Sequence, residues 1–435
     1  MSQSALLESR HFLPLFITQF LGAFNDNVYK NALVIYIAFT AAEAMHINSS
    51  ILVILAGGVF ILPFFLFSAT AGQLADRFEK TLLIRCIKSA EIAIMCVGAV
   101  GFWFGDIVLL MVALFLMGTH STLFGPIKYG ILPQHLALAE LTGGNGLIQM
   151  ATYLAILVGT MLGGVLVALE DSGPLIVSVV TILIACLGRA ASAYIPAAAP
   201  VDPGLRVDLN FPRQTVAILR RAFAARFIGL ALLAISWFWF AGATFLSLVP
   251  TFTRDVLMGD ERVATLLLTA FSVGIGLGSL LCERFSRANV EPGLVPFGAL
   301  GLGVFALDLW LADPGGAAGA AQSVGQFLGE FGNWRILLDL VLIGFSGGIY
   351  VVPLYALLQV RAEEAFRSRM IAANNIMNAV FMVGSALLTI ALIRAGLGPQ
   401  DIFGLVGLAT FLVTGAVFAA WPEFWQRAGK LIGSE

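Results

Sequence analysis

The stretch GQLADRFEK, residues 72–80, separates two long apolar runs, residues 48–70 and 81–104. Each run reaches the roughly 20 residues that a helix needs to cross a hydrocarbon core of ~30 Å. Inside lipid every backbone N–H and C=O group must find a hydrogen-bond partner within the protein. A single segment can satisfy its own backbone groups by forming a helix. The stretch therefore predicts a helical hairpin in a membrane, with a short charged loop between its two helices.

The rest of the 435-residue chain repeats this pattern. Hydrophobic residues make up 59% and charged residues 11%, with a mean hydropathy of +0.93. Soluble proteins carry about 25% charged residues, so most of this surface must face lipid. An all-α membrane protein with twelve transmembrane helices is predicted. The expected spans are residues 12–39, 48–70, 81–104, 107–130, 140–168, 174–195, 226–252, 262–283, 293–311, 335–359, 367–394 and 401–421.

The basic residues orient these spans. Most of the 24 Lys and Arg residues fall in alternate loops, which predicts that those loops and both termini are cytoplasmic. The Ala/Gly-rich interval 312–334 then lies outside and is expected to be a flexible loop without a site.

A long polar interval divides six spans from six. Residues 196–225 are rich in Pro and Arg, which gives an N-terminal bundle at 1–195, a cytoplasmic linker at 196–225 and a C-terminal bundle at 226–435. The segment Phe211–Phe227 is either an amphipathic helix on the inner membrane surface or a plain linker.

The two halves resemble each other. Residues 123–129 and 144–149 share with residues 349–355 and 373–378 the order aromatic, proline, tyrosine, asparagine. A parallel duplication of six helices predicts a pseudo-two-fold axis along the membrane normal, with a cavity between the halves.

The loop 72–80 resembles the G-x-x-x-D-R-x-G-R-[RK] loop of the major facilitator superfamily. Gly72 would let helices approach closely, and Asp76 followed by Arg77 would form a gating loop. The aspartate is expected to cap a helix terminus or to pair with a basic residue. Glu79 departs from the pattern, because the family has glycine there. The resemblance implies two six-helix bundles, the major facilitator fold, and transport by alternating access.

Charged residues within the first span are candidate site residues. An ionisable side chain near mid-bilayer costs several kcal/mol unless it is paired or hydrated. Asp26 and Lys30 are four residues apart and share a helix face, where they could neutralise each other, and Asn27 lies on an adjoining stripe. Two interpretations stay open and are compatible: a structural ion pair, and a site for a lipid headgroup or a coupling ion.

Other polar or aromatic residues in the spans are weaker candidates. Lys128 could hold a phosphate or extend to the interface, and Glu91 could pair with Lys88 or Lys128 or carry a proton, structural pairing being favoured. Asparagines and glutamines can serve as interhelical contacts as well as ligands. Those on spans five and eleven are Asn145, Gln149, Asn374, Asn375 and Asn378. Trp237 and Trp239 would suit an acyl chain or simple packing.

Three strings resemble the lysophospholipid transporter (LplT) family, and the first is especially similar to the transporter domains that some bacteria fuse to an acyltransferase. They are QFLGAFNDNVYKNAL from Gln19, FGPIKYGIL from Phe124 and GGNGLIQMATYLAILVGTMLGGVL from Gly143, all in the N-terminal half. After about residue 200 only a general superfamily likeness is expected. Asn25, where some members have glycine, and the absence of a basic residue in 236–249 depart from the family.

The resemblance implies inward flipping of lysophospholipids, chiefly lysophosphatidylethanolamine, across a bacterial inner membrane for reacylation. Membrane lipids and a separate acyltransferase on the inner side are its candidate partners, and no nucleic acid is expected. Within the motifs, it assigns ligand contacts to Asp26, Asn27 and Lys128. A multidrug exporter of the same superfamily is the alternative, because few charges and 34 Phe residues also suit a hydrophobic drug.

Enzymatic chemistry is not expected. None of the four histidines begins the His-x-x-x-x-Asp motif of an acyltransferase, and no GK[ST] phosphate loop occurs. No metal site or cofactor is predicted, and Na⁺ or a proton is the candidate coupling ion.

Overall fold

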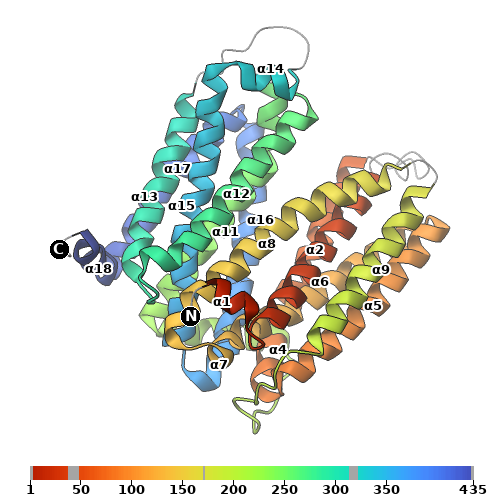
Figure 1. The fold of residues 1–435 in the computed structure, drawn as a ribbon, viewed down its shortest axis with the longest axis vertical. Coiled ribbons are helices and arrows are strands. Elements are labelled where there is room, and N and C mark those ends of the chain that lie inside the picture. The colour runs from red at the N-terminus through yellow and green to blue at the C-terminus, as the bar shows by residue number, and fades with distance from the viewer. Residues whose placement is uncertain (1–2, 38–48, 170–171, 313–321, 433–435) are drawn as a thin grey trace. The chain divides into compact units, whose positions relative to one another are not determined.

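The computed structural model describes residues 3–37, 49–169, 172–312 and 322–432 and is helical almost throughout (Figure 1). Long helices lie at all twelve predicted positions, which confirms the fold class. They are α2 (Leu13–Tyr36), α4 (Ser49–Arg77), α5 (Lys80–Phe104), α6 (Ile107–Gly130), α8 (Leu141–Val167), α9 (Gly173–Ser192), α11 (Arg226–Asp255), α12 (Glu261–Phe285), α13 (Val295–Leu311), α15 (Phe331–Arg361), α16 (Arg367–Arg394) and α17 (Pro399–Ala420).

Short helices fill several connections. They are α1 (Gln3–Glu8), α7 (Leu132–His135), η2 (Leu138–Glu140), α10 (Phe211–Ala224), η4 (Pro292–Leu294), α14 (Val324–Gly329), η5 (Glu364–Phe366) and α18 (Glu423–Ile432). Of the two alternatives left open for residues 211–227, the structure has the helix, α10. In the interval 312–334, residues 313–321 lie outside the described residues, as do residues 38, 39 and 48 at the ends of the first two predicted spans. The end of this interval is helical rather than a flexible loop, because it contains α14 and the start of α15.

Ten helices in the described part of the chain are long and apolar enough to cross a membrane. The other two long helices, α2 and α5, have 24 and 25 residues and carry Asp26, Lys30, Lys88 and Glu91. Their polar residues therefore need partners inside the protein.

The chain forms two compact units. The first comprises Met1–Ala137, Leu154–Ala222 and Arg361–Ile376, and the second Leu138–Tyr153, Phe223–Val360 and Met377–Glu435. Helices α8 and α16 each contribute to both units. The separate predictions of a six-plus-six division at residues 196–225 and of cytoplasmic termini stay predictions.

The first unit has its core where α2, α5, α6 and α9 meet. Tyr29 and Phe102 pack edge to face with ring centroids 5.9 Å apart, beside Leu110, Met117 and Val177. The Tyr29 hydroxyl donates to the Leu110 carbonyl at 3.0 Å, so its burial leaves no unpaired hydroxyl. This packing fixes the rotation of α2 about its axis and so the direction of its polar residues.

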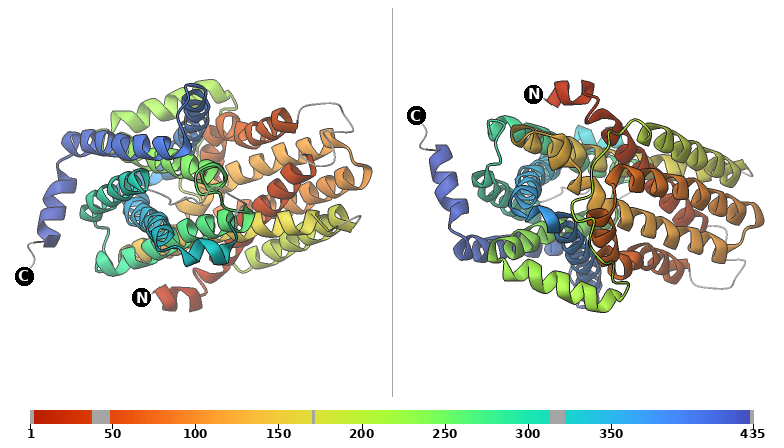
Figure 2. Two further views of the ribbon diagram at one scale, coloured as in Figure 1. Left: turned by 90° about the horizontal axis from the view of Figure 1, so that it is seen from above. Right: turned by 90° about the horizontal axis from the view of Figure 1, so that it is seen from below.

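In the second unit, α11, α12, α13, α15 and α17 run alongside one another (Figure 1). Phe245 stacks on Phe403 at 4.8 Å and on Phe271 at 5.9 Å, which joins α11 to α17 and α12. The C-terminal helix α18 runs crosswise to these long helices (Figure 2). Such an orientation suits an amphipathic helix lying along a membrane surface.

Candidate functional site

Glu91 is the centre of a fully buried polar cluster in the first unit. Its Oε2 atom lies 2.5 Å from the Lys88 ammonium and 3.2 Å from Nε2 of His120, and its Oε1 atom accepts a 2.9 Å hydrogen bond from the Asn25 amide. Lys88, Glu91 and Asn25 have no exposed surface. The structure therefore shows a structural pairing of Glu91, with Lys88 of the two lysines that the sequence left open, and the cluster joins α2, α5 and α6.

A second polar group surrounds Asp26, on the same helix. The Ser121 hydroxyl of α6 donates to its Oδ2 atom, whereas its buried Oδ1 atom accepts no hydrogen bond from the described residues. Within that part of the chain no cation lies in salt-bridge contact with Asp26, so it does not pair with Lys30 in the way the four-residue spacing suggested. Lys30 lies about one helical turn after Asp26 on α2, and Lys128 lies on α6, the helix that provides Ser121.

The two lysines face aromatic rings instead of carboxylates. The Lys30 ammonium lies 5.3 Å from the Phe60 ring centroid, and the Lys128 ammonium lies 4.7 Å from that of Tyr129. Cation–π contacts of this kind leave the hydrogen-bond donors of an ammonium group available. The Asp26 group thus offers one carboxylate oxygen and two ammonium groups to a ligand, while the Glu91 cluster is internally paired.

An apolar groove of about 480 Å³ lies between α4, α5 and α6 of the first unit. Its lining includes Leu74, Ala90, Leu116 and Ile127, and His120 also lines it. The His120 ring therefore forms part of the groove wall while its Nε2 atom faces Glu91. Ser121 follows His120 on α6, so this helix contributes one residue to the groove and the next to the Asp26 group.

The predicted amide residues of the second unit hold helices together. Asn145 of α8 and Gln359 of α15 exchange two hydrogen bonds, of 2.6 and 3.1 Å, and Asn378 accepts one of 2.9 Å from Ser236. Gln149 of α8 is also buried in this unit. Asn374 and Asn375 belong to the first unit, where Asn375 packs against Gly125. Any contact of these residues with a ligand stays a prediction.

The tryptophans of α11 are held by internal hydrogen bonds. Trp237 Nε1 donates to the Thr410 hydroxyl at 3.1 Å, and Trp239 Nε1 donates to the Tyr355 hydroxyl at 3.2 Å. These bonds satisfy the polar edge of each indole and fix its ring. Trp237 and Trp239 thus lie in the second unit, whereas Asp26, Lys30 and Lys128 lie in the first.

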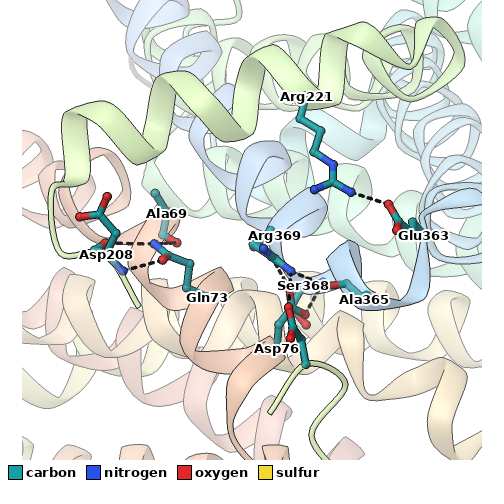
Figure 3. A network of polar contacts seen from close by, with 10 residues as sticks. Ala69, Gln73, Asp76, Asp208, Arg221, Glu363, Ala365, Ser368 and Arg369 are labelled. Atoms are coloured by element: carbon teal, nitrogen blue, oxygen red, sulfur yellow. Dashed lines mark hydrogen bonds and ion pairs between the residues drawn. The ribbon is translucent and has the colours of Figure 1, made fainter. Parts of the chain in front are cut away.

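The loop 72–80 binds a segment from the second half of the sequence, residues 361–376, which belongs to the first unit (Figure 3). Asp76 is fully buried; it accepts a 3.1 Å hydrogen bond from the backbone N–H of Ser368 and a 2.8 Å bond from Nε of Arg369. It therefore both caps the first turn of α16 and pairs with a basic residue. At Gly72 a Cβ atom would lie 2.9 Å from the Arg369 Cα atom, so this contact requires glycine.

The first part of the linker, residues 196–210, is extended and forms hydrogen bonds with the same loop; we call it the strap. Glu79 accepts a 3.2 Å bond from the Ala198 N–H, and the Asp76 carbonyl accepts from Val201 and Asp202 at 3.0 and 2.9 Å. The Asp202 carboxylate lies 3.3 Å from the Arg369 guanidinium as a second partner. The residue that departs from the superfamily pattern, Glu79, is thus used to hold the linker.

Helix α10 follows the strap and begins with a capped turn. Asp208 accepts from the Asn210 N–H at 2.9 Å and from the Gln214 amide at 2.7 Å, and these bonds hold the pKa of its carboxyl below the ordinary value. Gln73 of α4 exchanges two hydrogen bonds with the Asp208 backbone. Further along, Arg221 forms an exposed 2.5 Å ion pair with Glu363 (Figure 3).

An Asp76→Asn substitution is expected to loosen residues 365–372. It removes a buried charge that accepts two hydrogen bonds, and bonds to charged groups contribute about 1.5–3 kcal/mol each. Amide hydrogen exchange in this segment, measured by mass spectrometry, should become at least about tenfold faster. Glu363→Gln is the matched control, since exposed ion pairs contribute at most about 1 kcal/mol. Equal acceleration in both variants would contradict the assignment.

Sequence reasoning missed three residues of this site. His120, Ser121 and Arg369 are not among the candidate site residues that the sequence indicates. Lys88 was found because it lies one turn from Glu91. Nothing local marks the other three, because their partners are 29 residues or more distant in the chain.

Comparisons with known proteins agree with this fold. Residues 15–386 match the family described as Major Facilitator Superfamily. The lysophospholipid transporter LplT of Serratia proteamaculans is 28% identical over 82% of each chain, and that of Escherichia fergusonii is 28% identical over 97% of each chain. The likeness to these transporters therefore extends through the second half of the chain. The expectation that it ends at about residue 200 was wrong.

Among solved structures, the human organic anion transporter MFSD10 (TETRAN) superimposes with a TM-score of 0.70. It shares 15% identity, and the alignment covers 94% of this chain and 99% of that one, so it shows the fold alone. The superfamily consists of transporters and not of enzymes. With its apolar helices, its loop 72–80 and a match over most of its length, the chain is a multi-pass membrane protein that belongs to the major facilitator superfamily.

Proposed function

We propose that this protein transports lysophospholipids, chiefly lysophosphatidylethanolamine, across a bacterial inner membrane. The observation that carries the proposal is the Oδ1 atom of Asp26, which accepts no hydrogen bond from the described residues, together with the ammonium groups of Lys30 and Lys128 and an apolar groove in the same unit. The names of the similar bacterial proteins support the substrate class.

The headgroup fits the Asp26 group by charge. A phosphoethanolamine head carries one ammonium and one phosphate. Its ammonium would donate to the free Oδ1 atom of Asp26, and its phosphate would accept from Lys30 and Lys128. Charge-assisted hydrogen bonds are the strong ones, which suits a site that must remove a zwitterion from water. Asn27, whose side-chain oxygen is buried without a donor in the described residues, would add a polar contact.

The single acyl chain fits the groove. Its volume of about 480 Å³ lies in the range of small-molecule pockets, and its lining is almost entirely aliphatic. Several lining residues, such as Ala90 and Cys86, lie on the exposed surface of α5. A chain could therefore enter sideways from lipid while the headgroup moves along the protein.

The remaining parts of the proposal concern direction and energy. We propose inward movement by alternating access, controlled at the loop 72–80, with reacylation by a separate acyltransferase on the inner side. Na⁺ or a proton at Asp26 is the candidate coupling ion. Without a coupling ion, a concentration gradient of the lysolipid, maintained because reacylation consumes it on the inner side, would equally sustain the flux.

The test is a flipping assay in proteoliposomes with fluorescently labelled lysophosphatidylethanolamine, run under a Na⁺ gradient, a proton gradient or no gradient. Protein-dependent movement of the lysolipid supports the proposal, and the gradient that accelerates it identifies the coupling ion. The free Asp26 oxygen would also suit a lipophilic cation. Movement of tetraphenylphosphonium without movement of the lysolipid would replace this proposal with a drug exporter.

Filling the groove should block long chains. Ala90→Phe places a ring in the groove from an exposed position and is expected to reduce flipping of a sixteen-carbon lysolipid about tenfold or more, because burying several CH₂ groups contributes about 0.8 kcal/mol each. Val100→Phe is the matched control, since Val100 lies on α5 outside the groove and is 45% exposed. A similar loss in both variants would argue against the groove as the chain site.

A further inference from the structure

A second groove, of about 350 Å³, lies in the second unit where α12 ends and α13 begins. Phe285, Phe297, Phe345 and Ile349 form apolar walls, and Leu431 of α18 contributes from the crosswise helix. Phe285 and Phe297 are 47% and 40% exposed, so the groove opens on the surface of the unit. Its volume and apolar walls suit part of one lipid acyl chain.

A cation lines this groove without a carboxylate partner. Arg287 is exposed, lines the groove, and makes no ion pair within the described part of the chain. Its backbone φ is 52° and that of Ala288 is 56°, both in the left-handed region that non-glycine residues rarely adopt. Two consecutive residues of this kind store strain that the surrounding structure must maintain. The backbone is thus held in the left-handed conformation at the position where Arg287 lines the groove.

Helix α18 closes one side of the groove and is fixed tightly. Phe424 and Ala428 are buried, whereas Trp425 is 57% exposed and Lys430 is also exposed. A Cβ atom at Gly293 of η4 would lie 2.7–2.9 Å from backbone atoms of α18, so the contact requires glycine. An exposed tryptophan and lysine on an amphipathic helix are typical of the membrane interface.

We propose that this groove is a binding site for a resident anionic phospholipid, phosphatidylglycerol. One acyl chain lies against the three phenylalanines, and the phosphodiester accepts from the Arg287 guanidinium, whose planar fork fits two phosphate oxygens. Lys430, the residue before Leu431, is exposed and likewise forms no ion pair with described residues, which favours a net negative head over a zwitterionic one. Basic pockets between transmembrane helices bind anionic headgroups in this way.

This site is separate from the transport site. All its lining residues belong to the second unit, and none of the residues assigned to the lysolipid lines it. Occupancy by phosphatidylglycerol therefore does not depend on the transport proposal, and either can fail without the other.

The test is native mass spectrometry of the purified full-length protein in detergent with equal concentrations of dioleoyl phosphatidylglycerol or dioleoyl phosphatidylcholine. The wild-type protein should retain one additional phosphatidylglycerol in preference to phosphatidylcholine. Arg287→Gln should weaken this retention about tenfold, the loss expected for a charge-assisted hydrogen bond. Arg284→Gln, which alters an equally exposed arginine outside the groove lining, should retain the lipid, as should the transport-site variant Asp26→Asn.

Three results would overturn the proposal. They are equal retention of the two lipids, an unchanged affinity in Arg287→Gln, or an equal loss in Arg284→Gln. Because Arg287 is exposed and unpaired, its variant should melt at the wild-type temperature in the absence of added lipid, which separates lost binding from misfolding.

Discussion

Glu91→Leu is expected to lower the free energy of unfolding by about 3–5 kcal/mol, the cost of leaving a buried charge without its partner. Glu91 is the carboxylate that neutralises Lys88, and both side chains are fully buried. The substitution would also leave the Asn25 amide without its acceptor and His120 without its neighbouring charge. Thermal unfolding in detergent, followed by tryptophan fluorescence, measures the loss.

A double variant distinguishes charge from packing. In Glu91→Leu/Lys88→Met both charges are gone, and replacing a buried ion pair by apolar residues of similar size is often nearly neutral. The double variant should therefore recover most of the stability lost in Glu91→Leu. If it were as unstable as the single variant, shape and not charge would explain the cluster. Asp255→Asn, which breaks the exposed pair with Arg254, should leave the melting temperature unchanged.

Asp26→Asn is expected to abolish most lysolipid flipping while the protein still folds. The carboxylate has no salt-bridge partner in the described residues, so neutralising it leaves no orphaned counter-charge in direct contact. If it binds the ammonium of the headgroup, the loss of a charge-assisted bond of about 1.5–3 kcal/mol lowers transport roughly 10- to 100-fold. The initial rate in proteoliposomes and the melting temperature are measured on the same preparation.

The control is Ser121→Ala, which keeps the charge of Asp26 and removes only its internal hydrogen bond. It should lose much less transport than Asp26→Asn. A fall in melting temperature that parallels the fall in transport would instead assign Asp26 a structural role. Unchanged flipping in a stable Asp26→Asn protein would remove this residue from the mechanism.

These two predictions rest on a difference between neighbouring charges. The Glu91 carboxylate is surrounded by an ammonium, an amide and an imidazole, so its role is to join helices. The Asp26 carboxylate, one residue beyond Asn25 on the same helix, keeps one oxygen without a donor among the residues that the structure describes. Burial alone does not separate a structural charge from a binding one, whereas the count of satisfied bonds does.

The sequence by itself determined the twelve spans, the loop 72–80 and the superfamily. Hydropathy and backbone hydrogen bonding in lipid are local properties, so each span can be recognised from its own residues. The motif indicated the close approach at Gly72 and, for Asp76, either a helix cap or an ion pair; the structure shows that Asp76 makes both.

Only the tertiary structure decided which polar groups meet. Asp26 and Lys30 share a helix face, yet Asp26 bonds to Ser121 and Lys30 faces Phe60. Glu79 holds Ala198 of the linker, which no spacing indicates. The physical reason is that membrane helices are apolar over most of their surface. Their composition therefore does not determine which face of each helix packs against a neighbouring helix. Close packing fixes that rotation, and with it the partner of every buried charge.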